Sequence, residues 1–491
     1  RIPIFEVVLT AGQGAPLHMK EWPTNITSRF LEMPTGSVEE TLFTTFLEVL
    51  PKHEHAVALS YMLSLAKEEN GGSTAQLFEV FGTVGIKFGQ LASIWKLFGE
   101  KVAKDAEHLK NHAKALSRYE VMTLAFSRHH EVKPLIQEFE KILGSASIKT
   151  TTRVRFKDGT VGVLALQGRH VKEILAMNID LGKKYLAKLK EKGVIQNSKF
   201  MMNLVEALEE QILGELDMKA ETEKMKRANE ILGQLNKEMN SDLKGWTMSV
   251  PQPLPGKPLT NELAFYDLAK SKAFDQLTPD VKASIGPMIV KASLKSLFRH
   301  GWFDPDRHTG NFLIDEETKT IHFLDFGQFE SFSKSSNPFK ADPRLVIAQF
   351  IKSLSELNAH AVIHYARQMV RPGSESEIDE PRLRGRVEAL FAMAKRNKTP
   401  DLKTLMVDVI NEIADSGLKF DTRYIFGGLK GLIVLYGENY VDPKDFESLL
   451  RTELKSLFIN KAPVVLTESL FTKKSAPLSR SYRCQQALMV H

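Results

Sequence analysis

The sequence contains very little cysteine, since Cys484 is the only one in 491 residues. A single thiol excludes an internal disulfide framework and a zinc site made of cysteines, and it favours a reducing compartment. Long apolar runs are also missing. A run such as Leu432 to Tyr436 is far shorter than the roughly 20 residues of a membrane-spanning helix, so we expect no transmembrane span. The chain begins with Arg1 rather than methionine, which is compatible with an upstream segment that carries targeting information.

Neither sign of charge dominates the composition. Lys and Arg number 66 against 60 Asp and Glu, which gives a net charge of +6. This mild basic excess is compatible with an anionic ligand or with peripheral association at an acidic membrane surface, but it is too small to predict nucleic-acid binding. Hydrophobic residues make up 43% of the chain, as in an ordinary globular protein with several packed layers. The sequence identifies no protein partner.

The first part of the chain is expected to be mostly helical. Residues 1–36 show no clear period, and no role is assigned to them. Ser37 and Glu40 form a capping-box pattern in front of apolar residues at helical spacing. A helix should therefore begin at this point. Helical patterns continue to about residue 142.

A change of architecture follows. Two runs, 145–156 and 160–167, flank a Lys-Asp-Gly turn and predict a β-hairpin. Residues 171–235 return to a helical pattern, and the proline-rich stretch 250–258 cannot lie inside a helix, so it should separate two lobes. The remaining expected elements are a helix from Thr278 to about His300, short strands at 312–314 and 321–324, and mostly helical segments to about residue 460.

The stretch that contains Asp306, Asn311 and Asp325 carries the most chemical information. Asp306 lies five residues before Asn311, and Asp325 begins an Asp-Phe-Gly triplet after a short hairpin. This is the spacing of the protein-kinase catalytic loop and metal-binding triplet. Hard cations prefer oxygen ligands from carboxylates and amides. The pattern therefore predicts a Mg-nucleotide site in which Asp306 is the catalytic group and Asn311 and Asp325 bind the metal.

Further motifs make a family resemblance specific. The segment Asp306-Arg307-His308-Thr309-Gly310-Asn311 resembles the Asp-Pro-His-Pro-Gly-Asn signature of the UbiB/ADCK (AarF-domain) atypical kinases, with both prolines replaced. The family's KxGQ motif is matched by Lys87, Gly89 and Gln90, and its ExD motif by Glu215 and Asp217. Over about residues 75–455 the chain is therefore similar to a divergent member of this family.

The resemblance implies a fold and a division of the chain. The fold is of the α+β class, protein-kinase-like and two-lobed, with a helical N-terminal extension and a mostly helical C-lobe. The expected regions are an N-terminal extension without an assigned role (1–74), the KxGQ helix with the nucleotide-binding N-lobe (75–255), a C-lobe with the catalytic and metal-binding loops (256–460), and a C-terminal tail (461–491).

The resemblance also implies roles for single residues. Lys87 is expected to form an ion pair with Glu215 or Asp217. The helix of Lys87 would cover the groove for a peptide substrate, which argues against ordinary protein-kinase activity. Glu209 is expected to be the αC-type glutamate that normally pairs with a lysine of the third strand. The start of the nucleotide-binding loop is matched by Ala146, Ser147, Ile148 and Lys149.

That lysine of the third strand is missing. In the run Val161 to Gln167 either Leu164 or Ala165 stands where the family has lysine. A lysine there would contact the α and β phosphates and the αC-type glutamate, so its loss should weaken nucleotide binding or slow transfer. We hypothesise that Lys149 or Lys87 replaces it.

Two functions remain open at this point. One is an atypical kinase or ATPase that uses ATP and Mg²⁺ and acts on a small molecule or lipid, for which the resemblance implies a link to isoprenoid-quinone (coenzyme Q) or lipid metabolism. The other is a pseudokinase scaffold with weak or no nucleotide turnover. By resemblance, the compartment is mitochondrial, plastid or bacterial cytoplasmic.

Overall fold

The computed structural model of the chain describes thirteen stretches, and all statements below refer to them: residues 36–50, 78, 82–98, 100–106, 117–145, 148–168, 170–194, 198–267, 272–332, 342–371, 379–396, 401–421 and 423–460. The expectations for residues 1–35 and for the tail 461–491 lie outside the described residues. Helices and small sheets alternate along the chain, which confirms the predicted α+β class.

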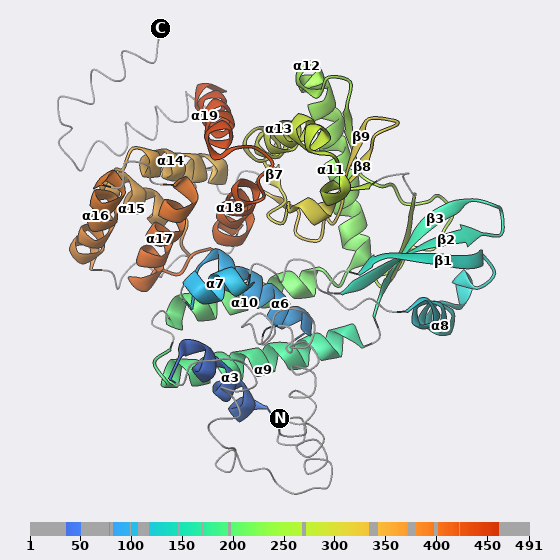
Figure 1. Cartoon of the computed structure of the whole chain (residues 1–491), viewed down its shortest axis with the longest axis horizontal. Coiled ribbons are helices and arrows are strands. Elements are labelled where there is room, and N and C mark those ends of the chain that lie inside the picture. The colour runs from blue at the N-terminus through green and yellow to red at the C-terminus, as the bar shows by residue number, and fades with distance from the viewer. Residues whose placement is uncertain are drawn as a thin grey trace, which may run out of the picture.

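A four-stranded antiparallel sheet stands at one end of the molecule (Figure 1). Its order is β1 (Ile136–Ser145), β2 (Lys149–Phe156), β3 (Val161–Gln167) and β5 (Leu263–Asp267). The predicted hairpin is confirmed as β2 and β3, with Lys149 opposite Gln167 and Arg155 opposite Val161. Strand β5 follows the boundary predicted at residue 255 and still pairs with β3, so this sheet draws on both predicted regions.

Strand β1 corrects the expectation of helix up to residue 142. Its buried or half-buried apolar residues are Ile136, Phe139 and Ile142, which recur every third position. The cause is a series of register shifts after Ile136, Phe139 and Ile142, since each bulge turns the next residues to the other face of the strand. The sequence thus mimics the spacing of a helix. These residues form a small core with α8 (Arg118–Arg128), which covers one face of the sheet.

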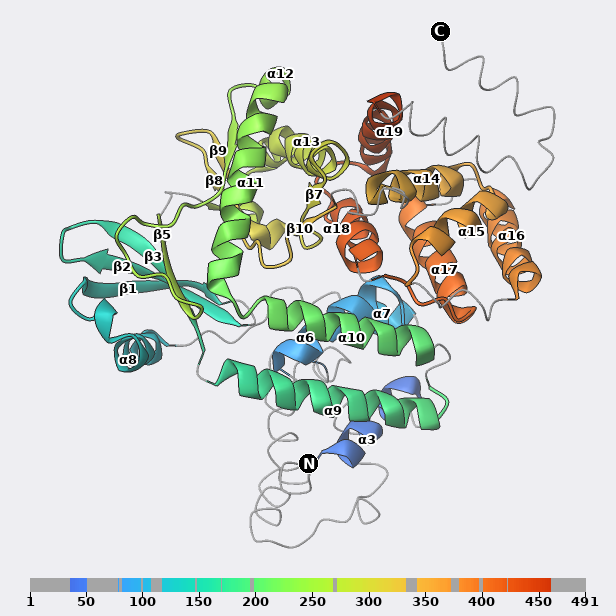
Figure 2. The same cartoon turned by 180° about the vertical axis from the view of Figure 1, so that it is seen from behind.

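Helices connect the sheet to the rest of the chain. The helical pattern predicted for 171–235 is confirmed as α9 (Val171–Glu191), α10 (Ser198–Gly214) and α11 (Met218–Glu238). Figure 2 shows α9 and α10 side by side, and α11 running up beside the sheet. The KxGQ helix α6 (Gly82–Ile94) packs against α9, α10 and α7 (Glu100–Ala106). Helix α3 (Val38–Val49) begins at the predicted cap Ser37, whose side chain accepts from the Glu40 amide.

A second four-stranded sheet contains the strands that lie between Asn311 and Asp325. Its order is β4 (Thr247–Ser249), β9 (Thr320–Phe323), β8 (Phe312–Asp315) and β6 (Lys272–Ala273). A separate two-stranded sheet pairs β7 (Trp302–Phe303) with β10 (Glu330–Ser331). Strands β8 and β9 confirm the two short strands predicted there. The predicted helix from residue 278 is α13 (Pro279–Lys295), continued by a π-turn over Ser296–His300.

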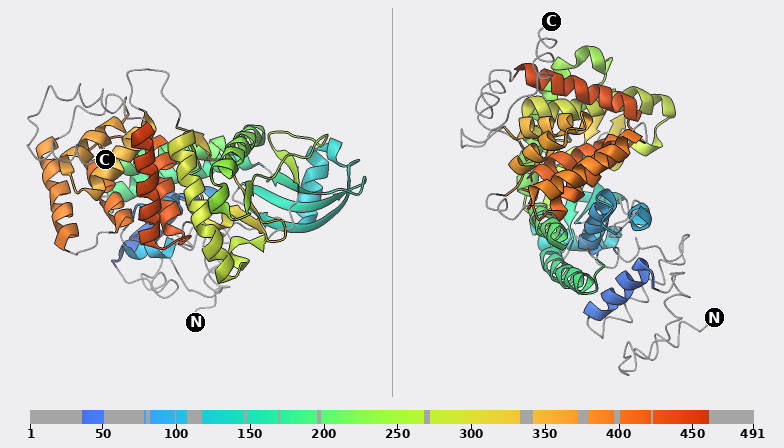
Figure 3. Two further views of the ribbon diagram at one scale, coloured as in Figure 1. Left: turned by 90° about the horizontal axis from the view of Figure 1, so that it is seen from above. Right: turned by 90° about the vertical axis from the view of Figure 1, so that its left-hand side faces the viewer.

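The remaining chain forms a helical region. Figure 3 shows it at the far side of the molecule from β1, β2 and β3. Its elements are α14 (Pro343–Ser355), α15 (Ala359–Gln368), α16 (Glu380–Arg396), α17 (Leu402–Asp415), the π-helix η8 (Arg423–Leu429), α18 (Lys430–Gly437) and α19 (Pro443–Asn460). Among the described helices, none has the length and apolar character needed to cross a bilayer.

Candidate functional site

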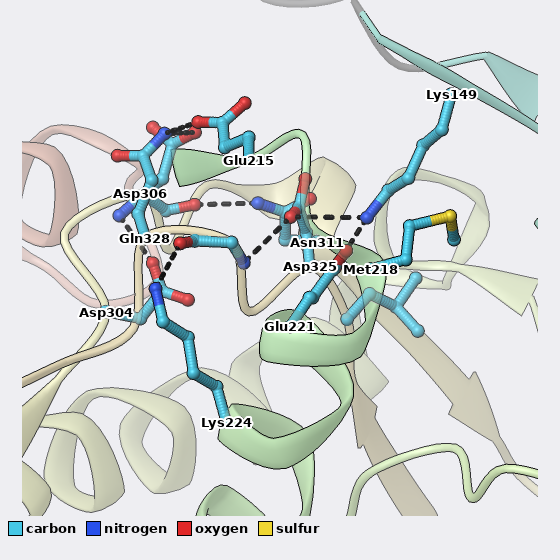
Figure 4. A network of polar contacts seen from close by, with 12 residues as sticks. Lys149, Glu215, Met218, Glu221, Lys224, Asp304, Asp306, Asn311, Asp325 and Gln328 are labelled. Atoms are coloured by element: carbon cyan, nitrogen blue, oxygen red, sulfur yellow. Dashed lines mark hydrogen bonds and ion pairs between the residues drawn. The ribbon is translucent and has the colours of Figure 1, made fainter. Parts of the chain in front are cut away.

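The three residues predicted to form the catalytic and metal site lie together. The side-chain amide of Asn311 donates to the backbone carbonyl of Asp306 at 2.8 Å. The backbone carbonyl of Asn311 accepts a hydrogen bond from the backbone amide of Leu324, the residue before Asp325, at 2.9 Å. Figure 4 shows the side chains of Asp306, Asn311 and Asp325 in one polar cluster with Lys149, Glu215, Glu221 and Gln328. We use the name polar cluster for these seven residues.

Asp325 has an uncommon backbone conformation and an ionised carboxylate. Its φ of +50° places it in the left-handed region, which is uncommon for residues other than glycine and often marks functional positions. Its carboxylate accepts from the Gly327 amide at 3.3 Å and keeps 39% of its side-chain surface exposed. Burial acts to raise the pKa of Asp325, but Lys149 and Lys87 outweigh it, so the pKa is lowered and the group is ionised.

The donor set fits magnesium on a nucleotide. Within the described stretches, no three His, Cys, Asp or Glu side chains are grouped to hold a metal. Asp325 and Asn311 offer one carboxylate and one amide oxygen, and no described residue donates to that amide oxygen. Mg²⁺ is commonly bound through one or two protein oxygens together with substrate phosphates and water. The residues present are therefore suited to a metal that arrives with a polyphosphate.

Lys149 supplies a positive charge beside this pair. Its ammonium lies 2.5 Å from a Glu221 oxygen and 3.6 Å from Asp325 Oδ1. Burial acts to lower the pKa of Lys149, but the two carboxylates raise it, so the side chain stays protonated. Figure 4 shows Lys149 descending from the sheet toward both acids.

The register of the sheet explains how Lys149 reaches this place. It pairs with Gln167, and Thr151 pairs with Ala165. Paired residues point to the same face, and side chains two apart along a strand share a face. Lys149 on β2 and Ala165 on β3 therefore face the same side. This is the side on which a lysine at position 165 would lie.

The partner of Lys149 corrects one prediction. Glu209 was expected to be the αC-type glutamate, but it lies on α10 and pairs with Lys183 of α9 at 2.6 Å. The glutamate that meets the sheet lysine is Glu221, in the first turn of α11. The sequence showed both acids as parts of one helical stretch. The helix is interrupted between α10 and α11, and this interruption decides which of the two glutamates faces the sheet.

The KxGQ and ExD motifs meet as an ion pair. Lys87 donates to Glu215 Oε1 at 2.8 Å, and both side chains are largely buried. Burial alone would lower the pKa of Lys87, but Glu215, Asp306 and Asp325 together raise it. Asp217 does not pair with Lys87. Its carboxylate caps the N-terminus of α11 by accepting hydrogen bonds from the amides of Lys219 and Ala220. Gly89 and Gln90 lie on the same helix, α6, as Lys87.

The predicted nucleotide loop is described only in part. Ala146 and Ser147 lie outside the described residues. Ile148 is buried, and its carbonyl accepts from the Gly168 amide at 3.3 Å, which holds the end of the loop against the end of β3. Of the two that are described, Ile148 and Lys149, it is Lys149 whose side chain lies in the polar cluster.

Arg307 and Thr309, which stand where the resembling family has prolines, both contact neighbouring segments. Arg307, in place of the first, is buried, forms an ion pair with Asp304, and donates to the carbonyl of Leu324 at 2.6 Å. Thr309, in place of the second, donates its backbone amide to a Glu438 oxygen at 2.9 Å, which proline could not do. Both residues therefore attach the segment from Asp304 to Asn311 to its neighbours.

Sequence reasoning missed two members of this environment, Gln328 and Lys430. Gln328 follows the Asp-Phe-Gly triplet, and its side-chain amide lies 3.3 Å from Asp306 Oδ2. Lys430 begins α18, and its ammonium lies 3.2 Å from Asp306 Oδ1. The position of Gln328 next to the triplet was a usable signal. Lys430 lies more than a hundred residues further along the chain, with no motif around it.

Comparison with known proteins adds a family match. A family model described as "ABC1 atypical kinase-like domain" matches residues 108–366, just over half of the chain. Among curated proteins, an uncharacterized protein in the hydrogenase 1 5′ region of Clostridium pasteurianum is 25% identical over 285 residues. The uncharacterized protein Rv0647c of Mycobacterium tuberculosis is 27% identical over 267 residues. The matched stretches cover 55% and 51% of this chain and 50% and 51% of those proteins, so the chain spans about half the length of the curated relatives it matches.

Solved structures show only a distant likeness. The Mycobacterium tuberculosis Rv3197–erythromycin complex is 15% identical with a TM-score of 0.38, and the match covers 79% of this chain and 93% of that one. The Chaetomium thermophilum Rio2 kinase in an ADP/Mg²⁺–phosphoaspartate complex is 13% identical with a TM-score of 0.23, over 76% of this chain and 96% of that one.

Proposed function

Because the chain belongs to the ABC1 atypical kinase-like family, as its UbiB/ADCK-type motifs indicated, we propose that it is an atypical kinase or ATPase that binds Mg-ATP in the polar cluster. The observation that carries the proposal is the gathering of Asp306, Asn311 and Asp325 around one place, with the charge of Lys149 beside Asp325. The same fold can host many activities, so the proposal rests on the residues of this site and not on the fold.

The proposed reaction assigns a task to each group. Asn311 and Asp325 would hold Mg²⁺, which when bound neutralises charge on the phosphates. An acceptor hydroxyl or water attacks the γ-phosphorus, the bond from that phosphorus to the bridging oxygen breaks, and ADP leaves. Asp306 orients the attacking oxygen and receives its proton. Phosphoryl transfer demands positioning more than covalent chemistry, so the hold on Asp306 matters more than its basicity.

Lys149 takes the role of the missing third-strand lysine. It projects from the neighbouring strand on the same face as Ala165 and pairs with the buried Glu221. In a nucleotide complex the ammonium would contact phosphate oxygens as a compact positive charge. The scaffold alternative drew its support from the absence of a lysine on β3, and the position of Lys149 removes most of that support.

A small acceptor suits the site better than an extended peptide. Helix α6 is tied by Lys87 to Glu215, and Glu215 in turn lies one side chain away from Asp306 through Gln328. This arrangement places the KxGQ helix near the catalytic aspartate. We therefore propose a small molecule or the head group of a lipid as acceptor, within the quinone or lipid metabolism that the family resemblance implies.

The test is Mg²⁺-dependent nucleotide binding and turnover by the full chain. Calorimetric titration with ATP, with and without Mg²⁺, is compared for the parent, Asp325→Asn and Asp306→Asn. We expect Asp325→Asn to weaken Mg-ATP binding by about 10-fold or more. Asp306→Asn should retain binding and lose turnover by about 100-fold or more, because it removes the group that orients the attacking oxygen.

A matched control changes an aspartate outside the site. Asp180 lies on α9 in an exposed pair with Lys184, so Asp180→Asn should leave binding and turnover unchanged. Nucleotide binding that is absent in the parent, or that does not depend on Mg²⁺, would exclude the enzyme proposal and restore the scaffold alternative.

A further inference from the structure

Gln328 is a buried amide whose three polar contacts all go to charged groups. Its nitrogen lies 3.2 Å from Glu215 Oε1 and 3.3 Å from Asp306 Oδ2. Its oxygen lies 3.1 Å from the ammonium of Lys430. The two carboxylates can only accept and the ammonium can only donate, so this is the orientation of the amide that satisfies every partner. Both amide hydrogens are thereby used at once.

Lys430 approaches Asp306 from a different part of the chain. Its side chain is 6% exposed, and its ammonium lies 3.2 Å from Asp306 Oδ1. The approach is fixed by backbone packing, because a Cβ on the next residue, Gly431, would lie 2.7 Å from the Cα of Pro305 and 2.3 Å from a Phe303 ring carbon. A glycine at this position lets α18 rest directly on the segment that leads into Asp306.

Asp306 is consequently held at every polar atom. Its backbone amide donates to Asp304 Oδ1 at 2.9 Å, and its carbonyl accepts from Asn311 at 2.8 Å. One carboxylate oxygen faces Lys430 and the other faces Gln328. Figure 4 shows Gln328 among Asp306, Asp325 and Glu215. A carboxylate held at both oxygens has one orientation.

We propose that Lys430 and Gln328 are positioning residues that fix the carboxylate of Asp306 for phosphoryl transfer, and that Gln328 links this orientation to the Lys87–Glu215 pair. The inference rests on the proposed function, since it assigns Asp306 the task of orienting the attacking oxygen. Small displacements of a catalytic group are costly, about 100-fold in rate for roughly 1 Å. Lys430 and Gln328 therefore act on rate through Asp306, without touching the nucleotide.

The first experiment separates positioning from plain stability. Lys430→Met, Lys430→Arg and the control Lys295→Met are measured for kcat, for KM with Mg-ATP and for Tm in the full chain. Lys295 is a matched control because it is also a buried lysine paired with a carboxylate, at 3.1 Å, but its partner is Glu453 and not Asp306.

We expect Lys430→Met to lower kcat by about 10- to 100-fold with KM for ATP within about threefold, since positioning acts in the transition state. Lys430→Arg should recover part of kcat, because it keeps a charge that can donate to Asp306. Lys295→Met should lower Tm and leave kcat per folded molecule within about twofold. An unchanged kcat in Lys430→Met, or an equal loss in Lys295→Met, would overturn the positioning role.

The second experiment tests the link through Gln328. The effect of Lys87→Met on kcat is measured in the parent and in Gln328→Met, which fills a similar volume without hydrogen bonds. We expect a change in kcat in the parent that shrinks to within about twofold once Gln328 is replaced, as for residues that act through a shared partner. No effect in the parent, or an equal effect in both backgrounds, would exclude the link.

A third measurement keeps the inference separate from the proposed function. Tm is measured for Lys430→Met, Asp306→Asn and the double variant, none of which needs nucleotide. Direct contact predicts that the two losses are not additive, since removing the second partner relieves a buried unpaired charge. Additive losses would overturn the contact even in an active enzyme. Non-additive losses in a chain without turnover would retain the contact and exclude the proposed function.

Discussion

The polar cluster, with Lys87 beside it, and the helix pair α9 and α10 provide lysine–glutamate pairs of the same chemistry in different surroundings. Lys149–Glu221 and Lys87–Glu215 are largely buried, with side chains between 5% and 19% exposed. Lys183–Glu209 spans α9 and α10 with about a third of each side chain exposed. Exposed pairs are screened by water and contribute little, whereas breaking a buried pair leaves a charge without compensation. Burial, and not the residue types, should decide the effect of each pair.

The largest expected effect is at Lys149, which belongs to both the fold and the proposed nucleotide site. Lys149→Met should lower the affinity for Mg-ATP or the turnover by about 100-fold, because the positive charge beside Asp325 is lost. It should also lower the unfolding free energy by about 3 kcal/mol, since Glu221 is left buried without a partner. Nucleotide titration and urea unfolding at pH 7 measure the two effects.

The same variant offers a rescue. Adding Ala165→Lys to Lys149→Met returns a lysine to the same face of the sheet from the adjacent strand, β3. Recovery of turnover in the double variant would support replacement of the third-strand lysine by Lys149. Parent-like nucleotide binding in Lys149→Met alone would contradict the role proposed for Lys149.

The next effect in size is at Lys87. Lys87→Met should reduce the unfolding free energy by about 2 kcal/mol, less than at Lys149. The reason is that Glu215 keeps hydrogen bonds from Gln211 at 3.4 Å and Gln328 at 3.2 Å after the lysine is gone. Urea unfolding compares the two variants directly. A larger loss for Lys87→Met than for Lys149→Met would show that these amides do not compensate Glu215.

A smaller effect distinguishes the two acids of the ExD motif. Asp217→Ala removes the N-cap of α11 and should destabilise the chain by about 1 kcal/mol, with little change in ATP affinity. Its partner in the motif, Glu215, holds Lys87 instead. Asp217→Asn, which can still cap a helix, should restore most of the lost stability. Equal losses for alanine and asparagine would argue against the capping role.

The smallest effect is expected at the exposed pair. Lys183→Met should change the unfolding free energy by less than about 1 kcal/mol and leave turnover unchanged. The pair lies between two helices outside the polar cluster, so the variant also serves as a control for Lys149→Met and Lys87→Met. A loss of turnover in Lys183→Met would contradict the comparison and would support Glu209 as the αC-type glutamate.

Several elements could be predicted because their signals are local. The hairpin β2–β3 follows from two strand-forming runs around a turn, and α3 and α13 begin at recognisable caps. Strand β1 could not be predicted, because its bulges give Ile136, Phe139 and Ile142 the spacing of a helix face. Whether such a pattern is strand or helix depends on the neighbour β2, which supplies the backbone hydrogen bonds.

The residues of the site can likewise be separated into those that the sequence predicted and those that it did not. The spacing of Asp306, Asn311 and Asp325 was readable because a catalytic loop and a following hairpin are continuous in sequence. The sequence could not show whether Glu209 or Glu221 pairs with the lysine of the sheet, because both glutamates lie on helical stretches. The interruption of the helix before α11 turns Glu221 toward the sheet. Lys430 was invisible because its contact with Asp306 joins distant parts of the chain.

By itself, the sequence determined the family, the mixed class of the fold and the segment that carries the candidate chemistry, because short motifs and local hydrogen-bonding patterns encode them. Tertiary structure alone decided which lysine stands beside Asp325, which glutamate pairs with it and which side chains hold Asp306. These pairings depend on strand register and helix packing, and both are set by burial of apolar surface across the whole chain rather than by neighbouring residues.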